Sequence, residues 1–237
     1  MRLNVRNLIF WLLVIAVVVA FHTVRRNATM RGIETVVVGN DICLLTQHDV
    51  DSIILASFPK LLQTDIKNVE EKKIREMLCE HPYVADAEVD MSTGGKLQVE
   101  VTQRVPVVRM FCKNREFYIS EQGSEMPLCA NHFCDVLVGS SEREVPAFES
   151  IWFVARFLYQ NPQYDGVFDQ VTENEKGDIV LTPKLGSTMV VVGDTTRLSE
   201  KFENLWAFYD QGVKKMGWDT YKTINLKYRG QVVGVKN

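Results

Sequence analysis

Cysteine and histidine are the residues of this chain with the richest chemistry, because both bind metals and cysteine also forms disulfides. The close pair Cys129 and Cys134 brackets His132. A zinc site needs a fourth ligand and usually a CxxC spacing, and this stretch offers neither. In an oxidising compartment the pair could close a small disulfide loop, or it could stay reduced. The other cysteines follow apolar residues and are expected to be buried thiols: Cys43, Cys79 and Cys112.

Motifs for covalent or metal-assisted catalysis are sparse. Neither G-x-S-x-G nor H-E-x-x-H occurs. Acidic pairs exist at Asp165/Asp169 and Glu142/Glu144, but isolated acidic pairs are typical of a solvated surface. The four histidines are His22, His48, His81 and His132. We therefore predict no catalytic residues, no metal, no cofactor and no small-molecule substrate; an exported cell-wall hydrolase is the alternative.

A long apolar segment near the N-terminus is the strongest indication of the compartment in which the rest of the chain lies. Residues 7–24 carry no formal charge, and residues 8–21 read LIFWLLVIAVVVAF. A helix of this length spans roughly 27 Å, close to the hydrocarbon core of a bilayer. We predict a single transmembrane anchor at 7–24, a cytoplasmic tail at 1–6 and an exported remainder.

A cleaved signal peptide is the competing interpretation of this segment, with Val18-x-Ala20 as its cleavage site. Arginines flank the segment on both sides, so the positive-inside rule does not decide its orientation. The tail is short and the domain behind the segment is large. This favours a cytoplasmic N-terminus and a periplasmic C-terminal part.

Charge limits the class of partner. Beyond residue 26 the chain carries 23 basic and 30 acidic residues, a net charge of −7. Nucleic acid binds to basic surfaces, so a nucleic-acid partner is not expected.

The first part of the exported region has the pattern strand–helix–helix–strand–strand. Strands are predicted at 33–38, 84–90 and 97–102 from β-branched or alternating apolar residues. Thr46 and Asp49 resemble a capping box that opens a helix at 47–57. A second helix is predicted at 69–80, with Asn68 as its cap.

The second part alternates strands with two amphipathic helices. The helices are predicted at 146–160 and 198–211. The predicted strands are 107–111, 117–120, 135–138, 167–173, 178–182, 188–193, 222–228 and 231–235. The fold class is therefore α+β, a mixed β domain with flanking helices.

The order of several short motifs resembles the bacterial cell-division family FtsQ, called DivIB in some lineages. The motifs are Gly39-Asn40, Leu45-Thr46-x-x-Asp49-Val50, His81-Pro82-Tyr83-Val84-x-x-Ala87-x-Val89, Leu97-x-Val99-x-Val101-x-x-Arg104-x-Pro106-Val107, Phe117-Tyr118-Ile119-x-x-x-Gly123 and Ile224-Asn225-Leu226-Lys227-Tyr228-x-Gly230-x-x-Val233-Gly234. The chain departs from the family pattern at Gln103, Ser120 and Val235, where the family has Glu, an acidic or Asn residue, and often an aromatic residue.

The resemblance implies a POTRA domain at 32–102 and a β domain at 103–237. It also implies a non-catalytic scaffold at the division septum, anchored in the inner membrane. Its partners would be FtsB/FtsL-type proteins (DivIC/FtsL), and through them the septal peptidoglycan synthases FtsW and FtsI. A POTRA-bearing secretion component is a further alternative, but such proteins usually repeat the unit or lead into a membrane β-barrel.

The expected partner site lies at the C-terminal end, where two strands run almost to residue 237. A terminal hairpin can leave a sheet edge to which a partner adds a strand. By resemblance, the partner-binding residues are Tyr228, Gly230 and Gly234. Tyr228 could instead pack across the strands, and the glycines could serve turn and bulge geometry.

Overall fold

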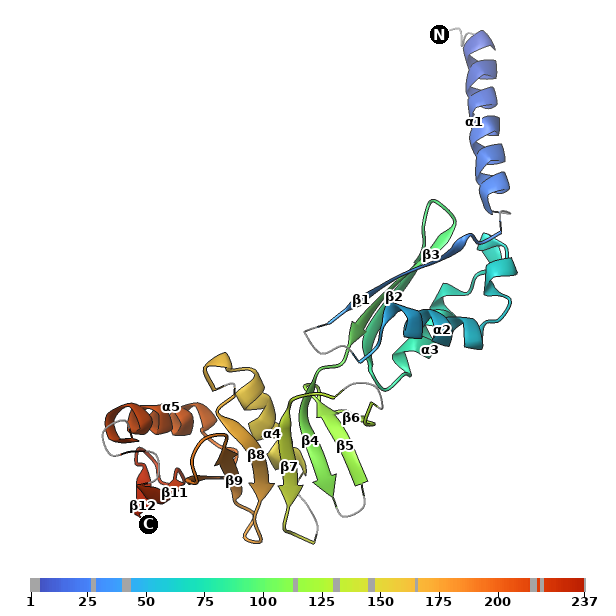
Figure 1. The fold of residues 1–237 in the computed structure, drawn as a ribbon. Helices are drawn as coiled ribbons and strands as arrows, with labels where there is room; N and C mark the ends of the chain where they lie inside the picture. The colour runs from blue at the N-terminus through green and yellow to red at the C-terminus, as the bar shows by residue number, and fades with distance from the viewer. Residues whose placement is uncertain are drawn as a thin grey trace. The chain divides into compact units, whose positions relative to one another are not determined.

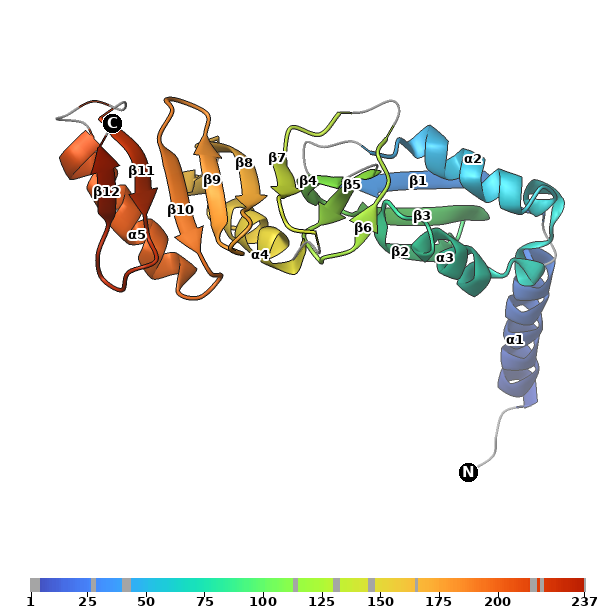
Figure 2. The ribbon, with the colours of Figure 1, turned by 90° about the horizontal axis from the view of Figure 1, so that it is seen from below.

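The chain divides into two compact units, Met1–Gln103 and Arg104–Asn237. The computed structural model describes residues 5–26, 29–39, 44–112, 115–129, 133–144, 148–164, 166–213, 217 and 220–236. Figures 1 and 2 show the elements of both units.

Helix α1 (Val5–Arg26) opens the first unit and coincides with the apolar segment. Between residues 9 and 19 its large apolar side chains are exposed, from 52% for Val18 to 62% for Trp11, except for half-buried Val14. Among the residues that the structure describes, no helix is both long and apolar enough to cross a membrane. The helix predicted for this segment is thus present.

A three-stranded sheet forms the body of the first unit. It consists of β1 (Gly32–Val38), β2 (Val84–Met91) and β3 (Lys96–Gln103), in the order β1-β3-β2. Strand β3 runs parallel to β1 and antiparallel to β2. Helices α2 (Gln47–Ser57) and α3 (Glu71–Cys79) cover one face of this sheet (Figures 1 and 2).

The core of this unit follows from strict alternation along β3, whose burial changes at every residue. Leu97, Val99 and Val101 are buried, and they share a cluster with Ile54 of α2 and Ile74 of α3. The intervening residues of β3 face solvent. This is the pattern of a sheet with one packed face, as the sequence predicts.

Local signals explain why one helix boundary was predicted correctly and the other was not. Thr46 caps α2 in a full capping box with Asp49, and the helix occupies the predicted range. The predicted helix at 69–80 begins at Glu71 instead, and its N-cap Glu70 makes no side-chain cap bond. Asn68, the expected cap, belongs to the 3-10 turn η2 (Ile66–Asn68), which follows η1 (Leu61–Gln63).

A nine-stranded mixed sheet forms the second unit, in the order β12-β11-β10-β9-β8-β7-β4-β5-β6. The pairs β4/β7, β7/β8 and β10/β11 are parallel, and the others are antiparallel. The strands are β4 (Pro106–Cys112), β5 (Arg115–Ser120), β6 (Glu125–Met126), β7 (Leu137–Ser141), β8 (Phe168–Glu173), β9 (Ile179–Pro183), β10 (Met189–Gly193), β11 (Tyr221–Asn225) and β12 (Val233–Lys236).

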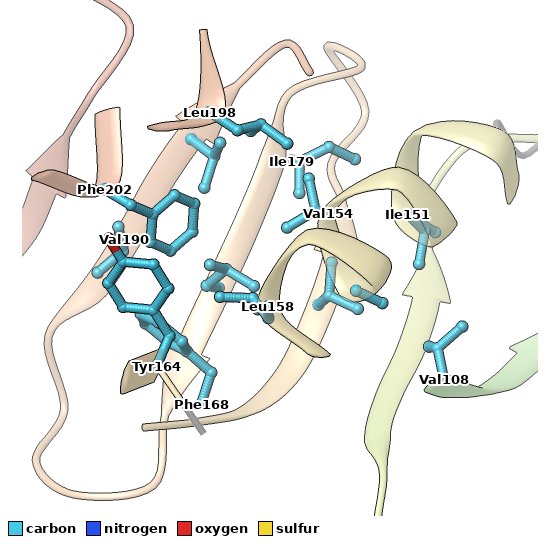
Figure 3. Packing of buried hydrophobic residues seen from close by; sticks show 14 of the residues in the cluster. Val108, Ile151, Val154, Leu158, Tyr164, Phe168, Ile179, Val190, Leu198 and Phe202 are labelled. Atoms are coloured by element: carbon cyan, nitrogen blue, oxygen red, sulfur yellow. The ribbon is translucent and has the colours of Figure 1, made fainter. Parts of the chain in front are cut away.

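Helices α4 (Phe148–Tyr159) and α5 (Leu198–Phe208) bury their apolar stripes in one cluster with the strands. Ile151, Val154 and Leu158 of α4 point to the same core as Phe202 of α5 (Figure 3). Their partners form one row across the sheet, linked by the strand registers: Met110, Gly139, Val171, Leu181, Val190 and Ile224. Both helices therefore lie on the same face.

The structure corrects the predicted elements near the C-terminus. Helix α5 ends at Phe208 and continues as a π turn, η4 (Tyr209–Val213), and a 3-10 turn, η3 (Pro162–Tyr164), follows α4. The strand predicted at 222–228 ends at Asn225, so Tyr228 is not a strand residue. The last strand starts at Val233 rather than 231. The short β6 was not predicted.

Candidate partner-binding edge

Strand β12 forms one edge of the nine-stranded sheet and pairs only with β11 among the described strands. Its apolar side chains are open to solvent, with Val233 exposed by 39% and Val235 by 54%. The backbone groups on the outer side of an edge strand lack a neighbouring strand, so they can accept an added one. The C-terminal strand pair thus provides the geometry for strand addition.

Gly234 lets β12 approach its neighbour. A Cβ atom at this position would lie 2.5 Å from Cδ1 and Cε1 of Tyr221. Tyr221 is buried and its ring stacks edge-on against Phe208, with 5.3 Å between centroids. The absence of a side chain at Gly234 therefore lets β12 pack directly on the Tyr221 ring. The Tyr221–Phe208 pair sets the main-chain position of Gly234.

Tyr228 and Gly230 lie in the connection between β11 and β12. Tyr228 is 56% exposed, and its carbonyl accepts a hydrogen bond from the N–H of Gln231 at 3.3 Å. Gly230 has a φ of 64°, which favours glycine. Its N–H donates to Oε1 of Glu200 in α5 at 3.2 Å. Gly230 thus lies in a turn, and the Tyr228 side chain is exposed in that connection.

Polar contacts tie β11 to the rest of the sheet, which it joins through only three register pairs with β10. Thr188 Oγ1 donates to the carbonyl of Tyr221 at 2.6 Å. Lys227 Nζ lies 2.8 Å from Oδ2 of Asp178, and this hydrogen bond raises the pKa of the Lys227 ammonium. These contacts fix the hairpin that carries the edge.

A buried ammonium group supports the start of α5, which in turn holds the Gly230 turn through Glu200. Lys201 is 3% exposed and its Nζ contacts both the carbonyl and Oδ1 of Asp194, at 2.7 and 2.6 Å. Hydrogen bonds from Lys201 and Thr196 lower the pKa of Asp194 to about 2. The Asp194 carboxylate is therefore ionised in the folded protein throughout the neutral range.

On the sheet face opposite the helices, one row of side chains that ends at the edge is uncharged. One row of register partners runs from Ser140 through Thr172, Val180, Val191 and Asn225 to Val233. A partner strand that joins β12 would extend an uncharged surface on this side.

The two closely spaced cysteines, Cys129 and Cys134, are both free thiols in the structure. Cys134 is buried, its N–H donates to the Tyr118 hydroxyl at 3.4 Å, and burial raises the pKa of its thiol. A raised pKa disfavours the reactive thiolate. A disulfide between Cys129 and Cys134 stays a prediction for an oxidising compartment.

The other candidate chemical groups do not converge in the part of the chain that the structure describes. No group of three or more His, Cys, Asp or Glu side chains there could hold a metal ion. Glu142 instead accepts a hydrogen bond from the N–H of Glu175 at 3.3 Å. His132 and Asp165 lie outside the described residues.

The sequence analysis missed one motif with a possible nucleophile. Ser57-x-x-Lys60 has the S-x-x-K pattern of some serine enzymes. Helix α2 ends at Ser57, so no helical turn brings Lys60 back over the serine.

A separate apolar pocket of about 290 Å³ in the second unit has Pro183, Leu185 and Trp206 in its wall. Burial raises the pKa of Tyr209, which also lines it, to about 12.

Reasoning from the sequence missed two residues of the edge strand, Val233 and Val235, and Glu200 of α5. The alternation that could have identified the valines is short, because β12 spans only Val233–Lys236. The Glu200 contact joins residues 30 positions apart and leaves no local signal.

Known protein families match both units of the chain. Residues 105–235 match the family described as FtsQ/DivIB, C-terminal related, and residues 34–102 match the POTRA-like domain. No curated protein matches the chain. The FtsQ/DivIB family is generally one of non-enzymatic division proteins. Because the first match covers more than half of the 237 residues, the resemblance expected from the sequence is confirmed and the chain belongs to the FtsQ/DivIB family.

Proposed function

We propose that this protein is a non-catalytic scaffold of the bacterial division complex that binds an FtsB/FtsL-type partner by strand addition to β12. Through that partner it would help regulate septal peptidoglycan synthesis by FtsW and FtsI. The observation that carries the proposal is the unpaired edge of β12 with exposed Val233 and Val235. Main-chain hydrogen bonds would supply affinity, and alternate side chains would supply specificity.

The partner site would comprise β12 together with the turn before it. Tyr228 stands exposed on a turn that Glu200 holds in place, which suits an aromatic anchor for a partner. Gly230 and Gly234 would act indirectly, since one forms the turn and the other allows close packing on Tyr221.

The proposal includes an inner-membrane anchor at 7–24, a cytoplasmic tail at 1–6, and a periplasmic POTRA domain (32–102) and β domain (103–237). Apolar side chains are exposed on all sides of α1 between residues 9 and 19. A helix that is apolar all round needs a surrounding apolar medium, either protein or lipid. In its host the protein would gather at the division septum.

The experiment is partner binding by Val235→Glu, with the full chain in detergent micelles and a purified FtsB/FtsL-type pair. A carboxylate at this edge position would be desolvated without a partner when another strand packs beside it. We expect binding to weaken at least about tenfold, equivalent to about 1.4 kcal/mol. In cells depleted of the native protein, the variant should leave filaments with segregated chromosomes.

Leu185→Glu is the matched control, because Leu185 is 76% exposed in the same unit but belongs to the β9–β10 connection. It should bind the pair and restore division. Equal binding by Val235→Glu and the native chain would contradict strand addition at β12.

A further inference from the structure

The three-stranded sheet of the first unit has two edges, and they are built differently. Edge strand β2 carries Asp86, Glu88 and Asp90 on its exposed side. Its register with β3 also shifts between Val84 and Asp86. Charged side chains and bulges are the usual protection of an edge against further pairing. Strand β2 is therefore protected against pairing with a further strand.

Strand β1, at the other edge, lacks this protection. It pairs with β3 in seven consecutive positions with no shift of register. Val36 and Val38 are 50% and 42% exposed, and Glu34 is the single charged residue of the strand. A long, regular, apolar edge is a template for another strand. Among the described strands, none pairs with its outer side.

The edge is also held rigidly from the helix side. Thr35 is buried and its Oγ1 donates to Oδ1 of Asp51 in α2 at 2.5 Å. Just before β1, the N–H of Met30 donates to the carbonyl of Thr64, and that of Arg31 donates to Gly95. A strand that is already fixed loses little conformational freedom when a partner binds.

The solvent face of this sheet is acidic right up to the open edge. Glu100 of β3 lies between Val36 of β1 and Glu88 of β2 in the strand registers. Two carboxylates directly opposite each other on neighbouring strands repel. Lys96 Nζ lies 3.7 Å from Oε2 of Glu34, which is a weak ion pair. Arg75 Nη2 forms a closer ion pair with Oδ1 of Asp86, at 3.0 Å. The face as a whole keeps an excess of negative charge.

We propose that β1 is a second strand-addition site, which takes an extended segment of another protein that alternates apolar residues with Lys or Arg. The apolar residues would lie on the helix face beside Ile33 and Val37, both partly buried against the core. The basic residues would lie on the acidic face. Their aliphatic stems would cover Val36, and their charged ends would reach Glu100 in the next strand.

A fluorescent peptide with the sequence Lys-Val-Lys-Val-Lys-Val-Lys serves as the probe, added to the full chain in detergent micelles. We expect it to bind more weakly as salt is raised, and the counterpart with Glu in place of Lys not to bind. Val36→Lys combined with Val38→Lys should weaken binding about tenfold or more. Glu100→Gln should weaken it less.

Leu62→Lys is the control, because Leu62 is 43% exposed in the same unit but belongs to η1. Circular dichroism would verify that every variant folds. Hydrogen exchange with bound peptide should protect amides of Gly32–Val38. Protection of β12 instead, equal binding of both peptides, or full binding by the β1 variant would overturn the proposal. None of these results depends on binding of an FtsB/FtsL-type pair at β12.

Discussion

Any side chain at position 234 would clash with the ring of Tyr221. The ring carbons of Tyr221 lie where a Cβ atom would come within 2.5 Å, and Phe208 supports that ring. In sequence, the glycine of a Val-Gly-Val strand indicates only a bulge or a close approach. Which ring makes the approach depends on the register of β11 with β12.

Replacement of this glycine should destabilise the second unit. We expect Gly234→Ala to cost about 1–3 kcal/mol of unfolding free energy, because overpacking forces the buried ring or the strand to move. Urea unfolding followed by tryptophan fluorescence measures the effect. Gly94→Ala is the control, since its nearest contact would be an ordinary 3.6 Å to Ser92. Equal stability of the two variants would contradict this close packing.

Asp194 makes the unfolding free energy of the second unit depend on pH in the acidic range. Its pKa in the folded protein is about 2, below the ordinary 3.8, because Lys201 and Thr196 hydrogen-bond to the carboxylate. A lowered pKa stabilises the fold above the ordinary value, and this contribution disappears as the pH falls toward about 2. The carboxylate is 67% exposed, so solvent screens part of the effect.

The measurement is urea unfolding of the native chain and Asp194→Asn at a series of pH values. We expect the variant to be less stable at pH values well above the ordinary pKa, and the difference to shrink as the pH falls through the lowered one. Glu203→Gln, an exposed change on α5, the helix that carries Lys201, should leave the profile unchanged. A difference that stays constant with pH would rule out the Asp194–Lys201 pair as its source.

At the scale of elements, α2 shows how a local signal fixes a boundary. The Thr46 hydroxyl accepts from the N–H of Asp49 at 3.2 Å, and the Asp49 carboxylate accepts from the N–H of Thr46 at 2.8 Å. All the required atoms lie within four residues, so the sequence is sufficient to predict this helix start. Helix α3 has no such side-chain cap, and it begins at Glu71, after the turn η2, rather than at the predicted position.

Loss of the capping box should weaken the first unit. We expect Thr46→Ala to cost about 1 kcal/mol, since the first-turn N–H groups lose a side-chain acceptor. Chemical denaturation followed by circular dichroism would show it. Ser57→Ala, exposed in the last turn of the same helix, should change stability by less than about 0.5 kcal/mol. A larger effect at Ser57 than at Thr46 would argue against the cap.

At the scale of the whole molecule, the proposed anchor predicts where the chain is found in the cell. Replacement of Leu12, Leu13 and Ile15 in α1 by Lys introduces charges that each cost about 2.5–3.5 kcal/mol at the centre of a membrane helix. We expect the native chain to sediment with membranes after alkaline carbonate washing, and the triple variant to move to the soluble fraction.

The control for this fractionation is the double variant Leu62→Lys and Leu185→Lys, which changes exposed apolar residues outside α1. It should stay in the membrane pellet. Release of the native chain by carbonate would contradict the anchor, while leaving the two strand-addition sites untouched.

The sequence by itself determined most element types, the α+β class and the family, because periodicity, capping residues and ordered motifs are local properties of the chain. Only the tertiary structure decided which strands become neighbours. It placed β4 beside β7, put both helices on one face and left β1 and β12 as open edges. Strand pairing joins residues far apart in sequence, so it depends on long-range packing that no short motif records.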